Sequence, residues 1–87
     1  MPVMFCNFDM FNMNAQVFSV DENDPSKSTL LYSGNFEDIC NFIATEYQSN
    51  KYNRVVLSGP YAEAVKDKVL TYSKSNYNFN EMSIEVL

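Results

Sequence analysis

The chain of 87 residues contains no histidine. Histidine is the commonest metal ligand in proteins and the commonest general acid or base, so its absence removes the usual basis for a metal centre or for proton-transfer catalysis. The sequence also has only two glycines, which leaves no glycine-rich loop through which backbone amides could approach a phosphate group. We therefore predict no catalytic residues, no metal and no cofactor.

Cysteine is scarce as well: Cys6 and Cys40 lie far apart and form no C-x-x-C motif. Each falls on an apolar face of a predicted element, which favours buried free thiols in a reducing compartment. Cys40 has no histidine to activate it as a nucleophile, so core packing is the better interpretation. No hydrophobic run approaches membrane-spanning length, and the N-terminal segment lacks the cationic region of a signal peptide. We expect a cytoplasmic protein, in the host cytoplasm if it is viral.

Positive charge is sparse, with six Lys and Arg against eleven Asp and Glu and a net charge of −5. Nucleic-acid-binding proteins usually neutralise phosphates with a basic patch, and here the cations are scattered. We therefore predict no nucleic-acid partner. Asp21, Glu22 and Asp24 form the clearest acidic cluster, which we interpret as a solvated loop rather than as a mimic of DNA.

Apolar residues, in contrast, make up 46% of the chain, which is enough for the packed core of a single domain over residues 1–87. The distribution of these residues predicts five strands. They cover Val3–Met10, Ala15–Val20, Thr29–Ser33, Arg54–Leu57 and Met82–Leu87. Arg54–Leu57 is apolar without alternation, as expected of a central strand that is buried on both faces.

Two helices are predicted between the last three strands. The first has Asn35 as its cap, and its apolar residues from Phe36 to Tyr47 recur at helical spacing. The second follows the turn Ser58-Gly59-Pro60. Its inner face is expected to hold Tyr61, Val65, Val69 and Tyr72. The polar segment from Ser73 to Glu81 then leads to the last strand.

The order of three strands, helix, strand, helix and strand resembles that of ribonuclease H-like proteins. The resemblance is one of topology and implies an α/β fold: a five-stranded mixed sheet in the order 3-2-1-4-5. Both crossovers then run in the same direction across the sheet, so both helices cover the same face. A ferredoxin-like arrangement is the alternative.

Nucleases of this group hold two metals between acidic residues on the first strand, the first helix and the end of the fourth strand. The resemblance would place Asp9 in the first position and Glu37 or Glu46 in the second. The third position holds Ser58, which has no carboxylate. A degenerate nucleotide- or metal-binding domain that uses Asp9 and the Ser58-Gly59 turn therefore stays an alternative, and catalysis is not predicted.

The second face of such a sheet would be left uncovered, and exposed apolar surface of this kind commonly binds proteins. We expect it to carry Val3, Phe5, one of Val55 and Val56, and part of Ala15–Val20. An aromatic cluster near the C-terminus is a second candidate contact surface. The predicted interaction residues are Val3, Phe5, Val17, Tyr77 and Phe79.

These observations favour a small acidic accessory protein without enzymatic activity. We expect it to act by self-association, as a dimer, or by binding a partner protein. The bias towards Asn, Phe and Tyr is common in small phage proteins, so a phage origin is expected.

Overall fold

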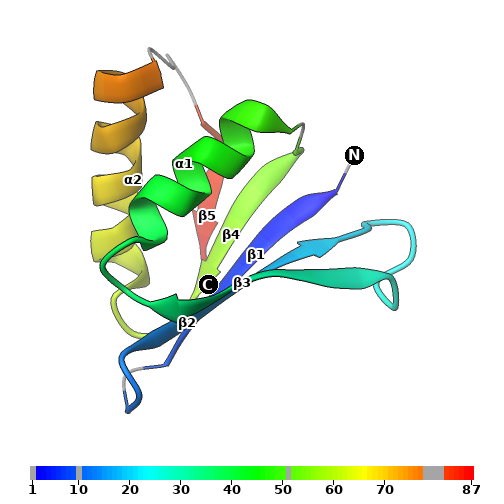
Figure 1. Cartoon of the computed structure of the whole chain (residues 1–87). Helices are drawn as coiled ribbons and strands as arrows, with labels where there is room; N and C mark the ends of the chain where they lie inside the picture. The colour runs from blue at the N-terminus through cyan, green and yellow to red at the C-terminus, as the bar shows by residue number, and fades with distance from the viewer. Residues whose placement is uncertain (1, 10, 51, 78–81) are drawn as a thin grey trace.

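A computed structural model describes residues 2–9, 11–50, 52–77 and 82–87. It contains a five-stranded sheet and two helices (Figure 1). In chain order the elements are β1 (Val3–Asp9), β2 (Asn14–Val20), β3 (Ser28–Asn35), α1 (Ile39–Ser49), β4 (Arg54–Ser58), α2 (Ala62–Tyr77) and β5 (Ile84–Val86). Among the described residues, neither helix combines the length and the apolar character needed to cross a membrane.

The strands are ordered β3-β2-β1-β4-β5, which confirms the predicted sheet. β1 pairs antiparallel with β2 and parallel with β4, so it lies at the centre. β3 extends the sheet on one side through antiparallel pairing with β2, and β5 extends it on the other through parallel pairing with β4. Figure 1 shows both helices on the same face of this sheet, as predicted.

Alternation along β1 decides which side chains face the helices. Met4 and Cys6 are completely buried under them, and Phe8 is nearly so. Because directly paired residues share a face of the sheet, Val17, which pairs with Cys6, also faces the helices. Val17 is 0% exposed, so its predicted role as a surface contact was wrong.

The core lies between this face and the two helices. β4 contributes Val55 and Leu57, and α1 contributes Ile39 and Ile43, all of them essentially inaccessible. On the other face of β4, Val56 is also buried, at 6% exposed, which agrees with the prediction of a central strand.

Helix α1 begins at Ile39, four residues later than Asn35, the predicted cap. Asn35 instead pairs with Asn14 at the end of β3, because the strand continues further than its sequence pattern indicates. Asp38 occupies the N-cap position without a side-chain capping hydrogen bond. Phe36 therefore precedes the helix, and its ring packs edge-on against Phe8 with centroids 5.6 Å apart.

Helix α2 also differs from its prediction at both ends. Tyr61 lies before the helix with a φ of 59° and is half exposed, so it does not belong to the buried inner face. The helix continues to Tyr77, so the first part of the predicted polar connection is helical. Ser73 within that part is 1% exposed, so this turn of the helix is packed against the rest of the domain.

Candidate functional site

The carboxyl ends of β1 and β4 are a candidate ligand site, because open α/β sheets bind ligands at the carboxyl ends of neighbouring strands whose connections run in opposite directions. Asp9 ends β1 here. One of its carboxylate oxygens accepts a hydrogen bond from the backbone N–H of Phe11 (3.0 Å), and the other accepts one from Nδ2 of Asn12 (2.8 Å). These hydrogen bonds, chiefly that from Asn12, lower the pKa of Asp9. The carboxylate therefore stabilises the turn into β2.

The Ser58-Gly59 turn lies against β1 rather than leaving a crevice. A Cβ atom at Gly59 would lie 2.6 Å from the backbone oxygen of Phe8. Gly59 has a φ of 113°, which residues with a side chain rarely adopt. The glycine thus permits a close approach between two backbones, which accounts for its presence without a ligand.

Of the two acidic residues that the resemblance would pair with Asp9, Glu37 is exposed in the segment before α1, and Glu46 lies away from Asp9. Glu46, near the end of α1, accepts hydrogen bonds from Asn50 Nδ2 (2.6 Å) and from the hydroxyl of Tyr52 (3.0 Å). Tyr52 lies two residues before β4, so Glu46 lies towards the opposite end of the sheet from Asp9. Within the described ranges, no three His, Cys, Asp or Glu side chains are grouped so that they could hold a metal ion.

The two cysteines are free thiols with different environments. Cys6 is inaccessible in β1, and burial raises its pKa to about 12. Cys40 is partly buried at the edge of a hollow of about 230 Å³ between α1 and α2, and burial raises its pKa too, partly offset by Lys68. A raised pKa disfavours the reactive thiolate, so neither thiol has the character of a nucleophile.

We expect the stability of the fold to fall between about pH 9 and pH 12. The pKa of Cys6 is about 12 in the folded chain against an ordinary value of 9.0, and burial together with Glu46 raises that of Tyr52 to about 12 from 10.0. Since both groups bind their protons more tightly when folded, their contribution is complete below these ordinary values and is lost as pH rises through the folded pKa. Urea unfolding at a series of pH values measures the effect. In Cys6→Ala the fall should be smaller; an identical fall would contradict the assignment to the thiol.

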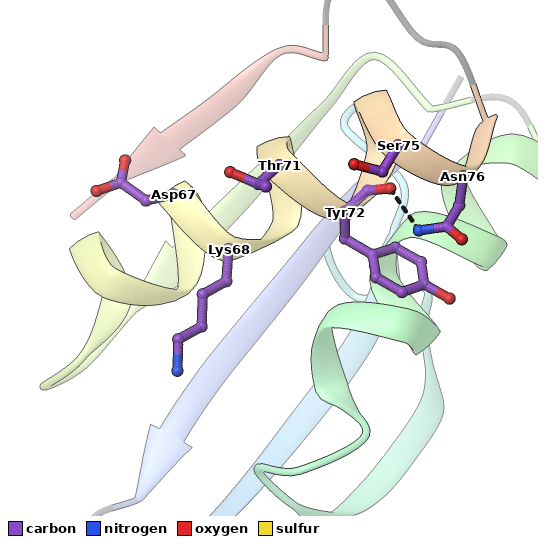
Figure 2. A pocket seen from close by; sticks show the side chains of 6 residues that line it. All are labelled: Asp67, Lys68, Thr71, Tyr72, Ser75 and Asn76. Atoms are coloured by element: carbon purple, nitrogen blue, oxygen red, sulfur yellow. Dashed lines mark hydrogen bonds between the residues drawn. The ribbon is translucent and has the colours of Figure 1, made fainter.

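A shallow hollow of about 460 Å³ lies along the outer side of α2 (Figure 2). Its lining residues are Asp67, Lys68, Thr71, Tyr72, Ser75 and Asn76. The hydroxyl of Tyr72 donates to Oδ1 of Asn41 on α1 (2.7 Å), and Nδ2 of Asn76 donates to the backbone oxygen of Tyr72 (3.0 Å). Because these bonds join α1 to α2 and hold the last turns of α2, we assign the polar groups to helix packing.

The most extensive candidate is the face of the sheet opposite the helices, here called the open face. None of the described elements covers it (Figure 1). The pairing register arranges its side chains in rows across the strands. One row runs Leu30, Phe18, Phe5, Val56 and Glu85, from β3 to β5. The neighbouring row runs Val20, Val3 and Arg54.

The rows towards the other end of the sheet are polar. Asn7 pairs with both Gln16 and Ser58, and Gln16 pairs with Ser33. The open face therefore has an apolar half and a polar half. Phe5 lies in the apolar half and Gln16 in the polar half, and both project from the same side of the sheet.

The apolar half is hollowed into a groove of about 530 Å³, here called the open-face groove. Its lining residues are Val3, Phe5, Val20, Asp21, Glu22, Pro25, Arg54, Val56, Glu85 and Leu87. Val3 and Val56 are only 6% exposed and form the floor, whereas Leu87 is 74% exposed at the margin. The loop that connects β2 to β3 forms one wall.

That loop is held by its own hydrogen bonds. The backbone N–H of Asp21 donates to the oxygen of Lys27 (3.2 Å), and that of Lys27 donates to the oxygen of Asp24 (2.9 Å). A carboxylate oxygen of Asp21 also accepts the N–H of Asn23 (2.9 Å). The acidic cluster is thus a loop, as predicted, and its position beside the apolar half could not be predicted from composition.

The structure brings together two of the predicted interaction residues, Val3 and Phe5, in the open-face groove. Val17 lies on the opposite face, Tyr77 is the last residue of α2, and Phe79 falls outside the described residues. The sequence analysis placed part of Ala15–Val20 on this face without singling out Phe18 and Val20, and it missed Leu30, Glu85 and Leu87. Because side chains alternate along a strand, Phe18 and Val20 lie on the face opposite to Val17.

Comparison with protein-family models, with curated proteins and with solved structures finds no match for this chain. The resemblance to ribonuclease H-like proteins therefore rests on strand order alone, and the function must be argued from the residues of the open face.

Proposed function

We propose that this chain is a small acidic protein-binding module that binds its partner through the open face of the sheet. The observation that carries the proposal is the apolar row from Leu30 through Phe18 and Phe5 to Val56, on a face that none of the described elements covers. A two-layer domain covers only one face of its sheet with helices. On the other face Val56 is shielded by its neighbours, whereas Phe5 and Phe18 are partly exposed and Leu30 is 54% exposed. Contiguous exposed apolar surface of this kind is typical of interaction sites.

The alternative, a nucleotide- or metal-binding site at Asp9 and the Ser58-Gly59 turn, has less support. The Asp9 carboxylate already accepts two hydrogen bonds within its own turn, and Gly59 lies against the backbone of Phe8. A reducing compartment such as the cytoplasm is part of the proposal, because both cysteines are free thiols.

Selection from a random peptide-display library tests the proposal while the partner is still unidentified. We expect the selected peptides to bind the wild-type chain and to bind Phe5→Thr about thirtyfold more weakly, because aromatic anchors at the centre of an interface often contribute about 2 kcal/mol or more. Threonine suits a strand, so the variant should fold. Titration by fluorescence polarisation measures the affinities.

The matched control is Gln16→Thr, which removes a side chain from the polar half of the same face. It should leave the affinity unchanged. Circular dichroism establishes that both variants are folded. Peptides that bind wild type and Phe5→Thr equally well would contradict the proposal.

A further inference from the structure

The open-face groove has an apolar floor and a charged margin, and the two together specify an occupant. Val3, Phe5 and Val56 supply the floor. A groove of about 530 Å³ is within the range of about 300–1,000 Å³ that is usual for binding pockets. The floor therefore suits the aliphatic or aromatic side chains of another chain.

The charge at the margin is negative. Asp21 and Glu22 stand on the wall formed by the β2–β3 loop, and Glu85 stands on β5. The cation that lines the groove is Arg54, and its guanidinium lies 3.7 Å from the carboxylate of Glu85. Among these lining side chains, three carboxylates thus accompany one cation, which is paired with one of the three, and the net charge is negative.

A second copy of the chain fits this margin poorly. A symmetric dimer across the open face would use the same patch on both copies. It would bring each copy's Asp21 and Glu22 towards an equally acidic margin, and like charges across an interface cost affinity. The net charge of −5 on each copy adds to this repulsion.

We infer that the open-face groove binds a basic amphipathic segment of a partner protein, in which apolar side chains alternate with lysine or arginine. The apolar side chains contact Val3, Phe5 and Val56, and the cations lie against Asp21, Glu22 and Glu85. This inference rests on the proposed function, because it names the class of partner for the same face. Complementary charge also increases the association rate and makes the affinity depend on salt.

A short amphipathic peptide of leucine and lysine is the probe, and the same peptide with glutamate in place of lysine is its control. We expect the lysine peptide to bind the wild-type chain, with an affinity that falls as salt is added, and the glutamate peptide not to bind. Glu22→Lys should weaken binding of the lysine peptide by about tenfold, because it replaces an attraction with a repulsion at the margin.

A charge reversal away from the groove separates local from global electrostatics. Asp67 is exposed on α2 and lines the hollow shown in Figure 2, so Asp67→Lys changes the net charge by the same amount without touching the groove. We expect it to weaken binding of the lysine peptide by less than about twofold, because charges beyond a Debye length of about 8 Å are largely screened at physiological salt. Equal losses from Glu22→Lys and Asp67→Lys would overturn the inference.

Two other outcomes separate the inference from the proposed function. If peptides from the random library need Phe5 but carry no excess of lysine or arginine, the open face binds proteins and the basic partner is wrong. If light scattering shows a dimer that Phe5→Thr abolishes, a second copy occupies the groove and the inference is also overturned. If no peptide depends on Phe5 and no dimer forms, the proposed function itself fails.

Discussion

Gly59→Ala is expected to lower the free energy of unfolding by about 3 kcal/mol, from strained backbone and from the displacement of a neighbour. The glycine has a φ of 113°, and the added Cβ would lie 2.6 Å from the oxygen and 3.3 Å from the nitrogen of Phe8. Both atoms belong to the backbone of the central strand. Phe8 pairs with Ala15 of β2, and the preceding residue, Asn7, pairs with Ser58 of β4, so these atoms cannot move aside independently. For a domain of this size, such a loss corresponds to a decrease of about 15 °C in the melting temperature.

Gly34→Ala is the matched control. There the added Cβ meets the hydroxyl of Tyr32 at 2.8 Å, which is the far end of a side chain. That side chain can shift by a few tenths of an ångström, although its hydroxyl then weakens a hydrogen bond to the backbone oxygen of Asn35 (3.0 Å) and its ring moves against Phe42, whose centroid lies 4.9 Å away. We expect a loss of about 1 kcal/mol. Thermal unfolding followed by circular dichroism compares the two variants, and equal losses would show that the close approach of Gly59 to Phe8 is not the determining feature.

Leu57→Ala is expected to cost about 3 kcal/mol of unfolding free energy, the second large effect. Leu57 is 0% exposed in β4, where it pairs with Cys6 and Val86 on the face beneath the helices. Truncation leaves a cavity between the sheet and the helices, and these elements can collapse into it only in part. Urea denaturation measures the loss.

Leu30→Ala is the control for Leu57→Ala, since the same chemical change is made on the open face at a residue that is 54% exposed. It should alter the unfolding free energy by less than about 0.5 kcal/mol. A loss as large as that of Leu57→Ala would mean that the open face belongs to the core and would also weaken the proposal that it binds a partner.

The sequence predicts the sheet well because the order of elements and the direction of crossovers leave few topologies. Alternation along β1 correctly separates Met4 and Cys6 from Val3 and Phe5. The boundaries of the helices are less well predicted. Asn35 has the character of a helix cap, but pairing with Asn14 keeps it in the sheet, and local propensity cannot reveal a bond to a distant strand.

The error at Val17 has a specific cause. The side of the sheet on which each residue of β2 lies depends on the number of residues in the turn after Asp9. In the structure β2 begins at Asn14, which pairs with Asp9, and this register sets Val17 opposite Cys6. A shift of one residue would have exchanged Val17 for Phe18 on the open face, and composition does not decide between the two.

The candidate site was predicted only in part for a related reason. The apolar sequence of β4 does not indicate whether Val55 or Val56 lies on the open face. The pairing of β4 with β1 decides this, because it places Val56 beside Phe5. Likewise, the sequence shows that the acidic residues between β2 and β3 form a loop. Their position at the margin of the open-face groove depends on the conformation of that loop relative to the sheet. A cluster assembled from four strands and a loop leaves no local motif.

The central position of β1 also determines the order in which the chain can complete its fold as it is synthesised. Val3 pairs with Val20 on one side and with Arg54 on the other, so the first strand made waits longest for its second neighbour. β2 and β3 can pair as soon as they emerge, whereas Met4, Cys6 and Phe8 stay without their helix cover until α1, β4 and α2 have followed. A nascent chain therefore exposes both faces of its first three strands. The ribosome must release most of the domain before the layer of helices and the core beneath it can form.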